Sequence, residues 1–118
     1  MKTEKDVEIY YRGNNSATIV KGGSLYLGNG LLKRLKLEKT IHVEVAFERT
    51  SQSIILIPTT KSNDNAYRLI SNPEGTGRII HLVGFCRYFK IGCDTYREYE
   101  GSLNDKNHVY LIPKTNNG

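Results

Sequence analysis

Apolar positions along the chain follow two periods, one of two residues and one of a helical turn. Apolar residues occupy every second position from Ile41 to Phe47, which predicts a half-buried strand at 41–47. Runs of β-favouring residues bounded by turn residues predict further strands at 17–20, 24–27, 54–57, 67–70, 78–82, 95–99 and 108–112. Two other segments have apolar side chains at i, i+1 and i+4, the pattern of one buried helix face: Leu31, Leu32 and Leu35, and Phe85, Cys86 and Phe89. The chain is therefore predicted to be mostly β with two short helices.

The predicted elements recur in the same order in the two halves of the chain. The segment 23–37 lies over 77–91 at a constant offset of 54 residues, and 54–58 matches 109–113 at an offset of 55. We expect a single domain, 1–118, with internal repeats at 17–58 and 67–113, a linker at 61–65 and a disordered tail at 114–118. Val7–Tyr11 is expected to form an added edge strand. The alternative is that any two strand-helix-strand stretches look alike.

One copy of this unit has too few apolar side chains and too many open sheet edges to be stable alone. Two copies in one chain favour a closed pseudo-twofold β-barrel, in which each half covers the edges of the other and the helices plug the ends.

The run SATIVKGGSLYLGNGLLKRLKLEKTIHVEVAFERTSQSIILIP resembles the swapped-hairpin unit of AbrB-like transition-state regulators and related antitoxins. Its order is strand, turn, strand, a short Leu-rich helix, and a hairpin that ends in an Ile-rich strand. Two such units in one chain resemble the tandem, MraZ-like arrangement. The run IIHLVGFCRYFKIGCDTYREYEGSLNDKNHVYLIP is similar to the closing part of DNA-binding pseudobarrel domains. The resemblance implies a barrel built from two AbrB-like strand-helix-hairpin repeats, and it implies DNA binding.

Positive charge is concentrated in the leading part of each repeat. The chain has 17 Lys+Arg and 12 Asp+Glu, a net charge of +5. The block 21–36 contains no acidic residue, and the block 68–90 contains one, Glu74. The basic residues of the first block are Lys21, Lys33, Arg34 and Lys36, and those of the second are Arg68, Arg78, Arg87 and Lys90. Because equivalent positions of a pseudo-twofold barrel come in pairs, we expect Lys33 to pair with Arg87, and Lys36 with Lys90, in one two-armed basic surface. Such a surface suits duplex DNA, whose phosphates supply most of the affinity.

The turns at 21–24 and 71–78 are the predicted base-reading loops, since their glycines allow close backbone approach. Ser24, Asn72 and Arg78 offer hydrogen-bond donors there, and the guanidinium of Arg78 suits a guanine edge. These residues predict a sequence-selective double-stranded DNA-binding protein, a transcriptional regulator. For any single lysine, the alternative is a solvated helix face.

Three other readings compete with DNA binding. The eight tyrosines favour a protein-binding module, for instance a viral or mobile-element inhibitor or assembly factor. A metal site would need Cys86 and Cys93 with His81, Asp94 and His108, but the cysteine spacing is not that of zinc knuckles and Cys86 is on a predicted buried face. A nuclease or metal enzyme is the third reading. With no catalytic motif and no cofactor fingerprint in the sequence, we predict no enzyme, metal or cofactor.

Two features bear on location and assembly. No apolar run approaches the ~18 residues of a membrane-spanning helix, and the start MKTEKDVEIYY has no apolar stretch of a signal peptide. We therefore expect a cytoplasmic protein that does not bind membranes. It would be a monomeric pseudo-dimer or a homodimer.

Overall fold

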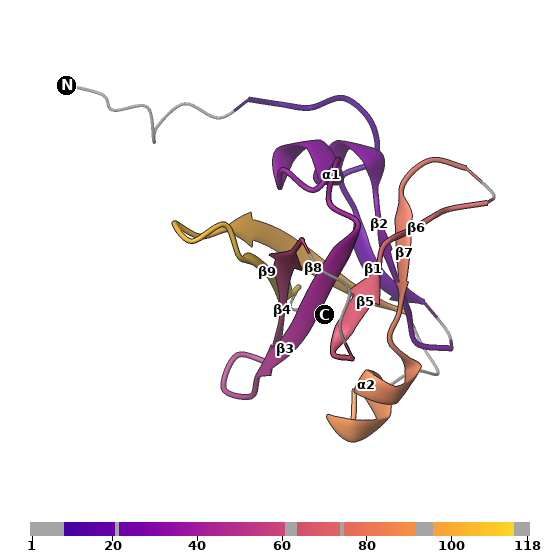
Figure 1. Cartoon of the computed structure of the whole chain (residues 1–118), viewed down its shortest axis with the longest axis vertical. Coiled ribbons are helices and arrows are strands. Elements are labelled where there is room, and N and C mark those ends of the chain that lie inside the picture. The colour runs from indigo at the N-terminus through magenta and orange to yellow at the C-terminus, as the bar shows by residue number, and fades with distance from the viewer. Residues whose placement is uncertain (1–8, 21, 61–63, 74, 92–95, 115–118) are drawn as a thin grey trace.

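The structure, a computed structural model, describes residues 9–20, 22–60, 64–73, 75–91 and 96–114. Within them the protein is mostly β, with strands of one antiparallel sheet and two short helices (Figure 1). The strands are β1 (Ala17–Val20), β2 (Ser24–Leu27), β3 (His42–Glu48), β4 (Ser53–Thr59), β5 (Ala66–Arg68), β6 (Ile70–Ser71), β7 (Arg78–His81), β8 (Arg97–Leu103) and β9 (Val109–Pro113). The helices are α1 (Asn29–Arg34) and α2 (Val83–Tyr88). The mostly β fold with two short helices that the sequence predicts is confirmed.

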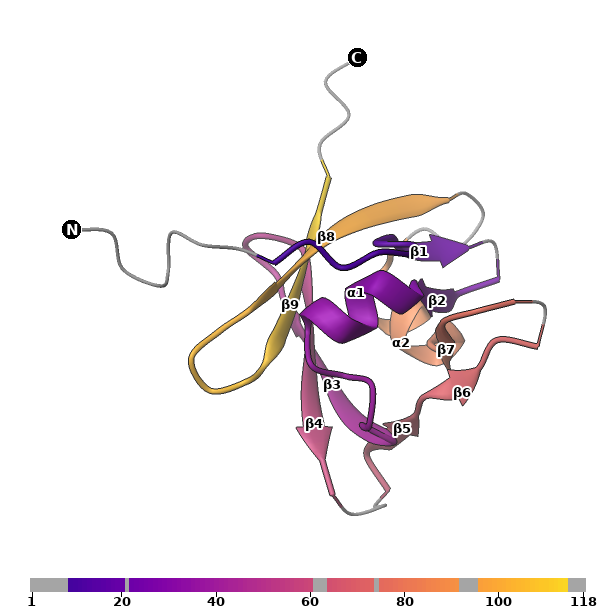
Figure 2. The ribbon, with the colours of Figure 1, turned by 90° about the horizontal axis from the view of Figure 1, so that it is seen from above.

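The sheet curls into a nearly closed barrel. Its strand order is β5-β3-β4-β9-β8-β1-β2-β7-β6, so its two end strands are β5 and β6. These two strands are separated in the chain by Leu69 alone, and the backbone N–H of Leu69 donates to the carbonyl of Ile41 at 2.8 Å. The segment 66–71 therefore spans the seam between β3 and β7, and Figure 2 shows α1 over one end of the resulting barrel.

Two strand pairings in this sheet keep the same register when each residue is replaced by its equivalent in the other half of the chain. In the β2–β7 pair, Ser24 lies opposite His81 and Leu27 lies opposite Arg78. Arg78 and His81 follow Ser24 and Leu27 by 54 residues, so this register maps onto itself. The register of the β4–β9 pair also maps onto itself, at an offset of 55 residues. Both registers are those of a twofold relation between the halves.

The two helices end in the same backbone motif. α1 and α2 begin 54 residues apart, and each is followed at the same distance by a lysine in the left-handed region, Lys36 at φ 60° and Lys90 at φ 59°. In both, the next N–H reaches back to the carbonyl five residues earlier at 2.8 Å. This is the Schellman arrangement, with lysine where glycine is usual. No helix in the described parts of the chain is long and apolar enough to cross a membrane.

Each helix packs against a strand of the other half. On α1, the methyl groups of Leu31 and Leu35 would lie 3.3 and 3.0 Å from a Cβ placed on Gly101 of β8. On α2, the ring of Phe85 packs edge-on to that of Phe47 of β3, with centroids 6.1 Å apart. The buried side chains of both helices join one core cluster with the inward faces of the strands. This exchange of contacts ties the two halves together.

Two predicted strands differ from the structure. The strand expected at 67–70 is divided into β5 and β6, because the chain changes partner from β3 to β7 at the buried Leu69. The strand expected at 95–99 is instead β8, which runs on to Leu103. Tyr96 precedes it and is exposed, and Tyr99 and Gly101 face inward. The other predicted strands match within two residues at each end.

The chain ends and the linker are described only in part. Ile9–Tyr11 belong to no strand, so the expected edge strand is not found there, and residues 7 and 8 lie outside the described residues. Of the expected linker, only Asp64 and Asn65 are described. Of the expected tail, only Lys114 is described, and its backbone N–H donates to the carbonyl of Glu98 at 3.0 Å.

Candidate nucleic-acid interface

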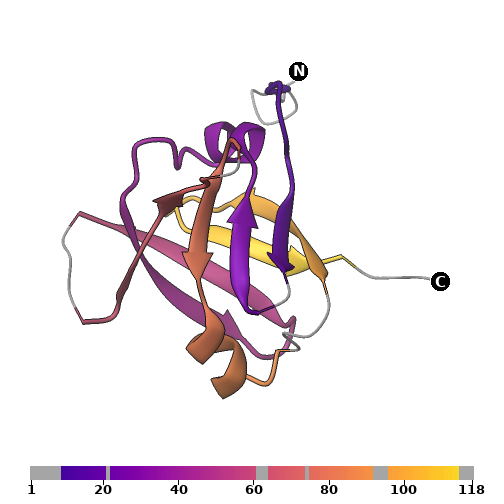
Figure 3. The same cartoon turned by 90° about the vertical axis from the view of Figure 1, so that its right-hand side faces the viewer.

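The two helices lie at opposite ends of the barrel (Figures 1 and 3). Lys33 and Lys36 are therefore exposed at one end, and Arg87 and Lys90 at the other. The expected two-armed surface, with Lys33 beside Arg87, is wrong. The cause is the direction of the twofold relation, which maps one end of the barrel onto the other instead of bringing related side chains together.

Each predicted reading loop lies beside the helix of the other half. A Cβ on Gly23, in the β1–β2 turn, would lie 2.8 Å from the Cα of Val83 at the start of α2. A Cβ on Gly77, which precedes β7, would lie 2.5 Å from the carbonyl oxygen of Leu27, just before α1. The structure thus places Lys33, Arg34, Lys36, Asn72 and Arg78 at the α1 end, and Ser24, Arg87 and Lys90 at the α2 end. Lys21 lies outside the described residues.

We expect Gly77→Ala to destabilise the protein by about 1–3 kcal/mol. Gly77 has φ +94°, and the added methyl group would meet the Leu27 carbonyl oxygen at 2.5 Å. The measurement is the free energy of unfolding by chemical denaturation. Gly75→Ala is the matched control, because its Cβ would meet only the Asn72 amide nitrogen, at 3.8 Å. Equal stability of the two variants would contradict the packing of this turn on the barrel.

Arg78 fastens the segment that follows α1 to β7. Its guanidinium donates one hydrogen bond to the carbonyl of Thr40 and another, 2.9 Å long, to the carbonyl of Glu38. The side chain is half-buried. Two of its five N–H donors are thus used by the backbone, so Arg78 positions the segment that follows α1. The expected contact with a guanine edge stays a prediction for its remaining donors.

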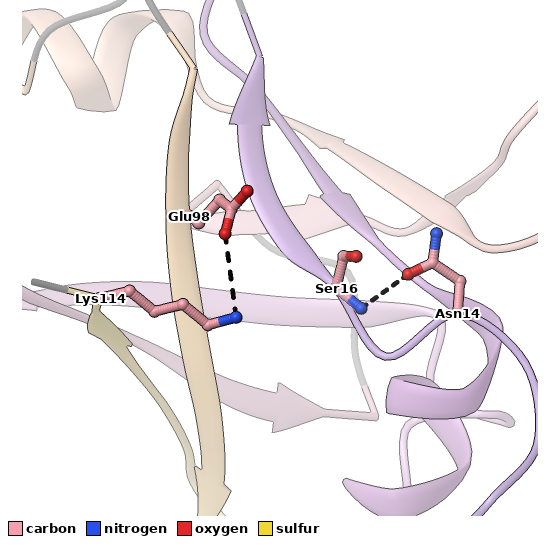
Figure 4. Close-up of polar contacts among 4 residues, drawn as sticks. All are labelled: Asn14, Ser16, Glu98 and Lys114. Carbon is pink, nitrogen blue, oxygen red and sulfur yellow. Dashed lines mark hydrogen bonds and ion pairs between the residues drawn. The ribbon is translucent and has the colours of Figure 1, made fainter. Parts of the chain in front are cut away.

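Residues 9–16 lie over the start of α1. The Asn14 carbonyl accepts hydrogen bonds from the backbone N–H groups of Gly30 and Leu31 at 2.8 and 3.2 Å. The Asn14 side chain in turn accepts the N–H of Ser16 at 2.8 Å (Figure 4). A Cβ on Gly30 would lie 3.1 Å from the carbonyl oxygen of Arg12, so Arg12 stands beside the helix. The sequence analysis missed Arg12, since this contact links residues far apart in the chain.

The α1 end carries a strong excess of positive charge. Among the described residues of 12–41 and 66–79, Glu38 is the one acidic residue, and the cationic residues are Arg12, Lys33, Arg34, Lys36, Lys39, Arg68 and Arg78. We call these cations the α1-end surface. Lys21 and Glu74 lie outside the described residues. Within the described part of the chain, none of these cations forms an ion pair with a carboxylate; the ion pair of Lys114 with Glu98, at 3.8 Å, lies elsewhere (Figure 4).

Comparisons with known proteins assign no family to the chain. No protein-family model, curated protein or solved structure matches the chain. Any function must therefore be argued from the residues and their positions.

The α2 end differs from the α1 end in its charge and its contacts. Arg49 lies over the ring of Phe89, 5.1 Å from its centroid, so part of the positive charge there is stacked on the aromatic cluster. The Ser24 hydroxyl is hydrogen-bonded to Nδ1 of His81 at 3.1 Å. Arg87 and Lys90 are exposed, with no segment like 9–16 laid over α2 among the described residues.

A groove of about 530 Å³ runs between the 9–15 segment, α1 and the outer face of β8 and β9. Its apolar lining is unusually exposed: Ile9 is 64% exposed, Tyr10 79% and Ile112 44%. Arg34 and Glu100 also line it, so the groove combines apolar surface with charges of both signs. These are features of a protein-contacting surface.

The metal reading gains no support from the described residues. Cys86 is fully buried in the core, and His81 bonds to Ser24. No group of three or more His, Cys, Asp or Glu side chains in the described ranges is placed to hold a metal ion. Cys93 and Asp94 lie outside those ranges.

Proposed function

We propose that this protein binds double-stranded DNA through the α1 end of the barrel, as a sequence-selective transcriptional regulator. The observation that carries the proposal is the α1-end surface, whose seven cations outnumber the neighbouring Glu38 and Glu100 and form no ion pair within the described chain. A duplex presents about one phosphate charge per 1.7 Å of its axis, so a dense, unpaired cationic surface matches it.

Selectivity would come from the 71–77 turn. Tyr26 holds this turn beside α1, because its hydroxyl donates to the Thr76 carbonyl at 3.3 Å and accepts from the Asn14 side chain at the same distance. Asn72, also in the turn, donates from its side chain to the same Thr76 carbonyl at 3.3 Å. On this proposal the cations beside the turn contact phosphates, and the turn enters a groove, where base edges are read.

The fold is compatible with two AbrB-like units in tandem. The self-related registers of β2 with β7 and of β4 with β9, and the matching ends of the two helices, support a duplicated unit. On this proposal the chain is a pseudo-dimer. Its halves have diverged in charge, so that one end of the barrel contacts DNA.

The test is a salt titration of binding to duplex DNA. If four cations of the α1-end surface contact phosphates, the slope of log affinity against log salt concentration is expected to be about −3.6, from ~0.9 per contact. Competition between a selected and a random duplex would measure selectivity. A slope near zero, or no binding at low salt, would contradict the proposal.

The groove between the 9–15 segment and β8–β9 favours a second candidate function, that of a protein-binding module. Tyr10, with 79% of its surface exposed, and the apolar Ile9 and Ile112 offer the kind of contact residues found in protein interfaces. This function would be marked by one stoichiometric protein partner that stays bound after nuclease treatment. A partner that is released by nuclease would favour DNA binding instead.

A further inference from the structure

A hollow of about 440 Å³ lies where the segment 66–71 crosses between β3 and β7. Two guanidinium side chains share it with a hydroxyl and apolar residues; its lining is Ile41, Arg68, Leu69, Ile70, Ser71 and Arg78. No carboxylate lines it, and in the described part of the chain neither arginine forms an ion pair. Two like charges around one hollow repel each other, so an anion placed between them would be stabilised.

Arg78 is fixed in place before any ligand arrives. Two of its five N–H donors are held by the carbonyls of Thr40 and Glu38, which sets the plane of the guanidinium. The remaining donors are left for another acceptor. Donors whose orientation is fixed in advance lose little freedom on binding, and this raises affinity.

We propose that this hollow binds a phosphate group. Arg68 and Arg78 would donate N–H groups to its oxygens, and the Ser71 hydroxyl would supply a further donor. A phosphate suits the hollow better than a carboxylate, because its oxygens point in several directions and can engage donors from more than one side.

The position of the hollow indicates which phosphate it takes. Ile41 lines it and also lines a neighbouring hollow with Lys39, so it adjoins the α1-end surface. Ile41 and Ile70 are 52% and 41% exposed and flank it with apolar surface, against which a sugar can pack. Resting on the proposed DNA binding, we assign it one backbone phosphate of the duplex. Free phosphate shares the same chemistry, and the two sources are separated below.

The first arm of the test uses inorganic phosphate and the whole protein. In a titration followed by amide NMR, we expect saturable shifts at Leu69, Ser71 and Arg78 that chloride at equal ionic strength does not produce. Arg68→Gln should remove them. This side chain is exposed on β5, and the substitution keeps the core intact. The absence of saturable shifts in the unaltered protein would overturn a site for free phosphate.

The second arm uses a duplex and compares Arg68→Gln with Arg87→Gln, which removes the same charge from an exposed position at the α2 end. We expect Arg68→Gln to weaken duplex binding by roughly tenfold and to reduce the salt slope by about 0.9, with little change for Arg87→Gln. If Arg68→Gln leaves duplex binding unchanged, the hollow does not bind a backbone phosphate, but the proposed DNA binding stands. Phosphate shifts without duplex binding would support the hollow as an anion site and overturn DNA binding.

Discussion

Replacing Lys33 and Lys36 together by glutamine is expected to weaken duplex binding by on the order of 100-fold and to reduce the salt slope by about 1.8, from two lost phosphate contacts. Both lysines are exposed in the last turn of α1 and just beyond it, away from the buried face formed by Leu31, Leu32 and Leu35. Their removal should therefore change charge and leave packing unaltered. Fluorescence anisotropy with a labelled duplex at several salt concentrations measures both quantities.

The chain contains its own matched control. Arg87 and Lys90 are the residues 54 positions later, and Lys90 has the same left-handed backbone as Lys36. Substituting this pair by glutamine removes two charges at equivalent points of α2, with the same backbone cost, at the other end of the barrel. If the α2 pair weakens binding as much as the α1 pair does, the duplex is not confined to the α1 end.

The sequence was sufficient to predict the elements whose patterns are local. Leu31, Leu32 and Leu35 mark the buried face of α1, because their spacing follows the helical period. Val43, Val45 and Phe47 alternate along β3 and contact the core, whereas Ile41, the first residue of the predicted series, precedes β3 and is exposed. The offset of 54 residues correctly placed α2 by comparison with α1. Local periodicity and self-similarity thus account for most of the element order.

Features that depend on distant contacts were not predictable in this way. The predicted strand ended at residue 99, yet β8 runs on through Gly101 and Ser102. A Cβ at 101 would lie 3.0 and 3.3 Å from methyl groups of Leu35 and Leu31 of α1, so α1 packs closely over this glycine. Only the folded arrangement shows that contact.

The spatial grouping of the candidate site residues was likewise not predictable from the sequence. The repeat identifies Lys33 and Arg87 as equivalent, but it does not say where the twofold relation places them, and the structure separates them to opposite ends. Arg12 and Lys39 join the α1-end surface through contacts of segment 9–16 and of the loop held by Arg78. The sign of the charge was readable from the sequence, and its grouping in space was not.

Phe85→Ala is expected to lower the free energy of unfolding by about 3–5 kcal/mol, and the melting temperature by roughly 10–20 °C. Phe85 is 7% exposed and packs against the rings of Phe47 and Phe89, with centroids 6.1 and 4.8 Å away. Truncating it leaves a cavity where α2 plugs the barrel. Val83→Ala is the control on the same helix, because that side chain is 44% exposed and should cost no more than about 0.5 kcal/mol.

The same variant separates stability from function. Since Phe85 is at the α2 end and the proposed DNA surface is at the α1 end, the folded fraction of Phe85→Ala at low temperature should bind the duplex with unchanged affinity. A folded variant that loses DNA binding would show that the α2 end takes part in the interface. A loss of stability no larger than that of Val83→Ala would show that α2 does not plug the barrel, because a buried aromatic side chain in a packed core cannot be removed at so small a cost.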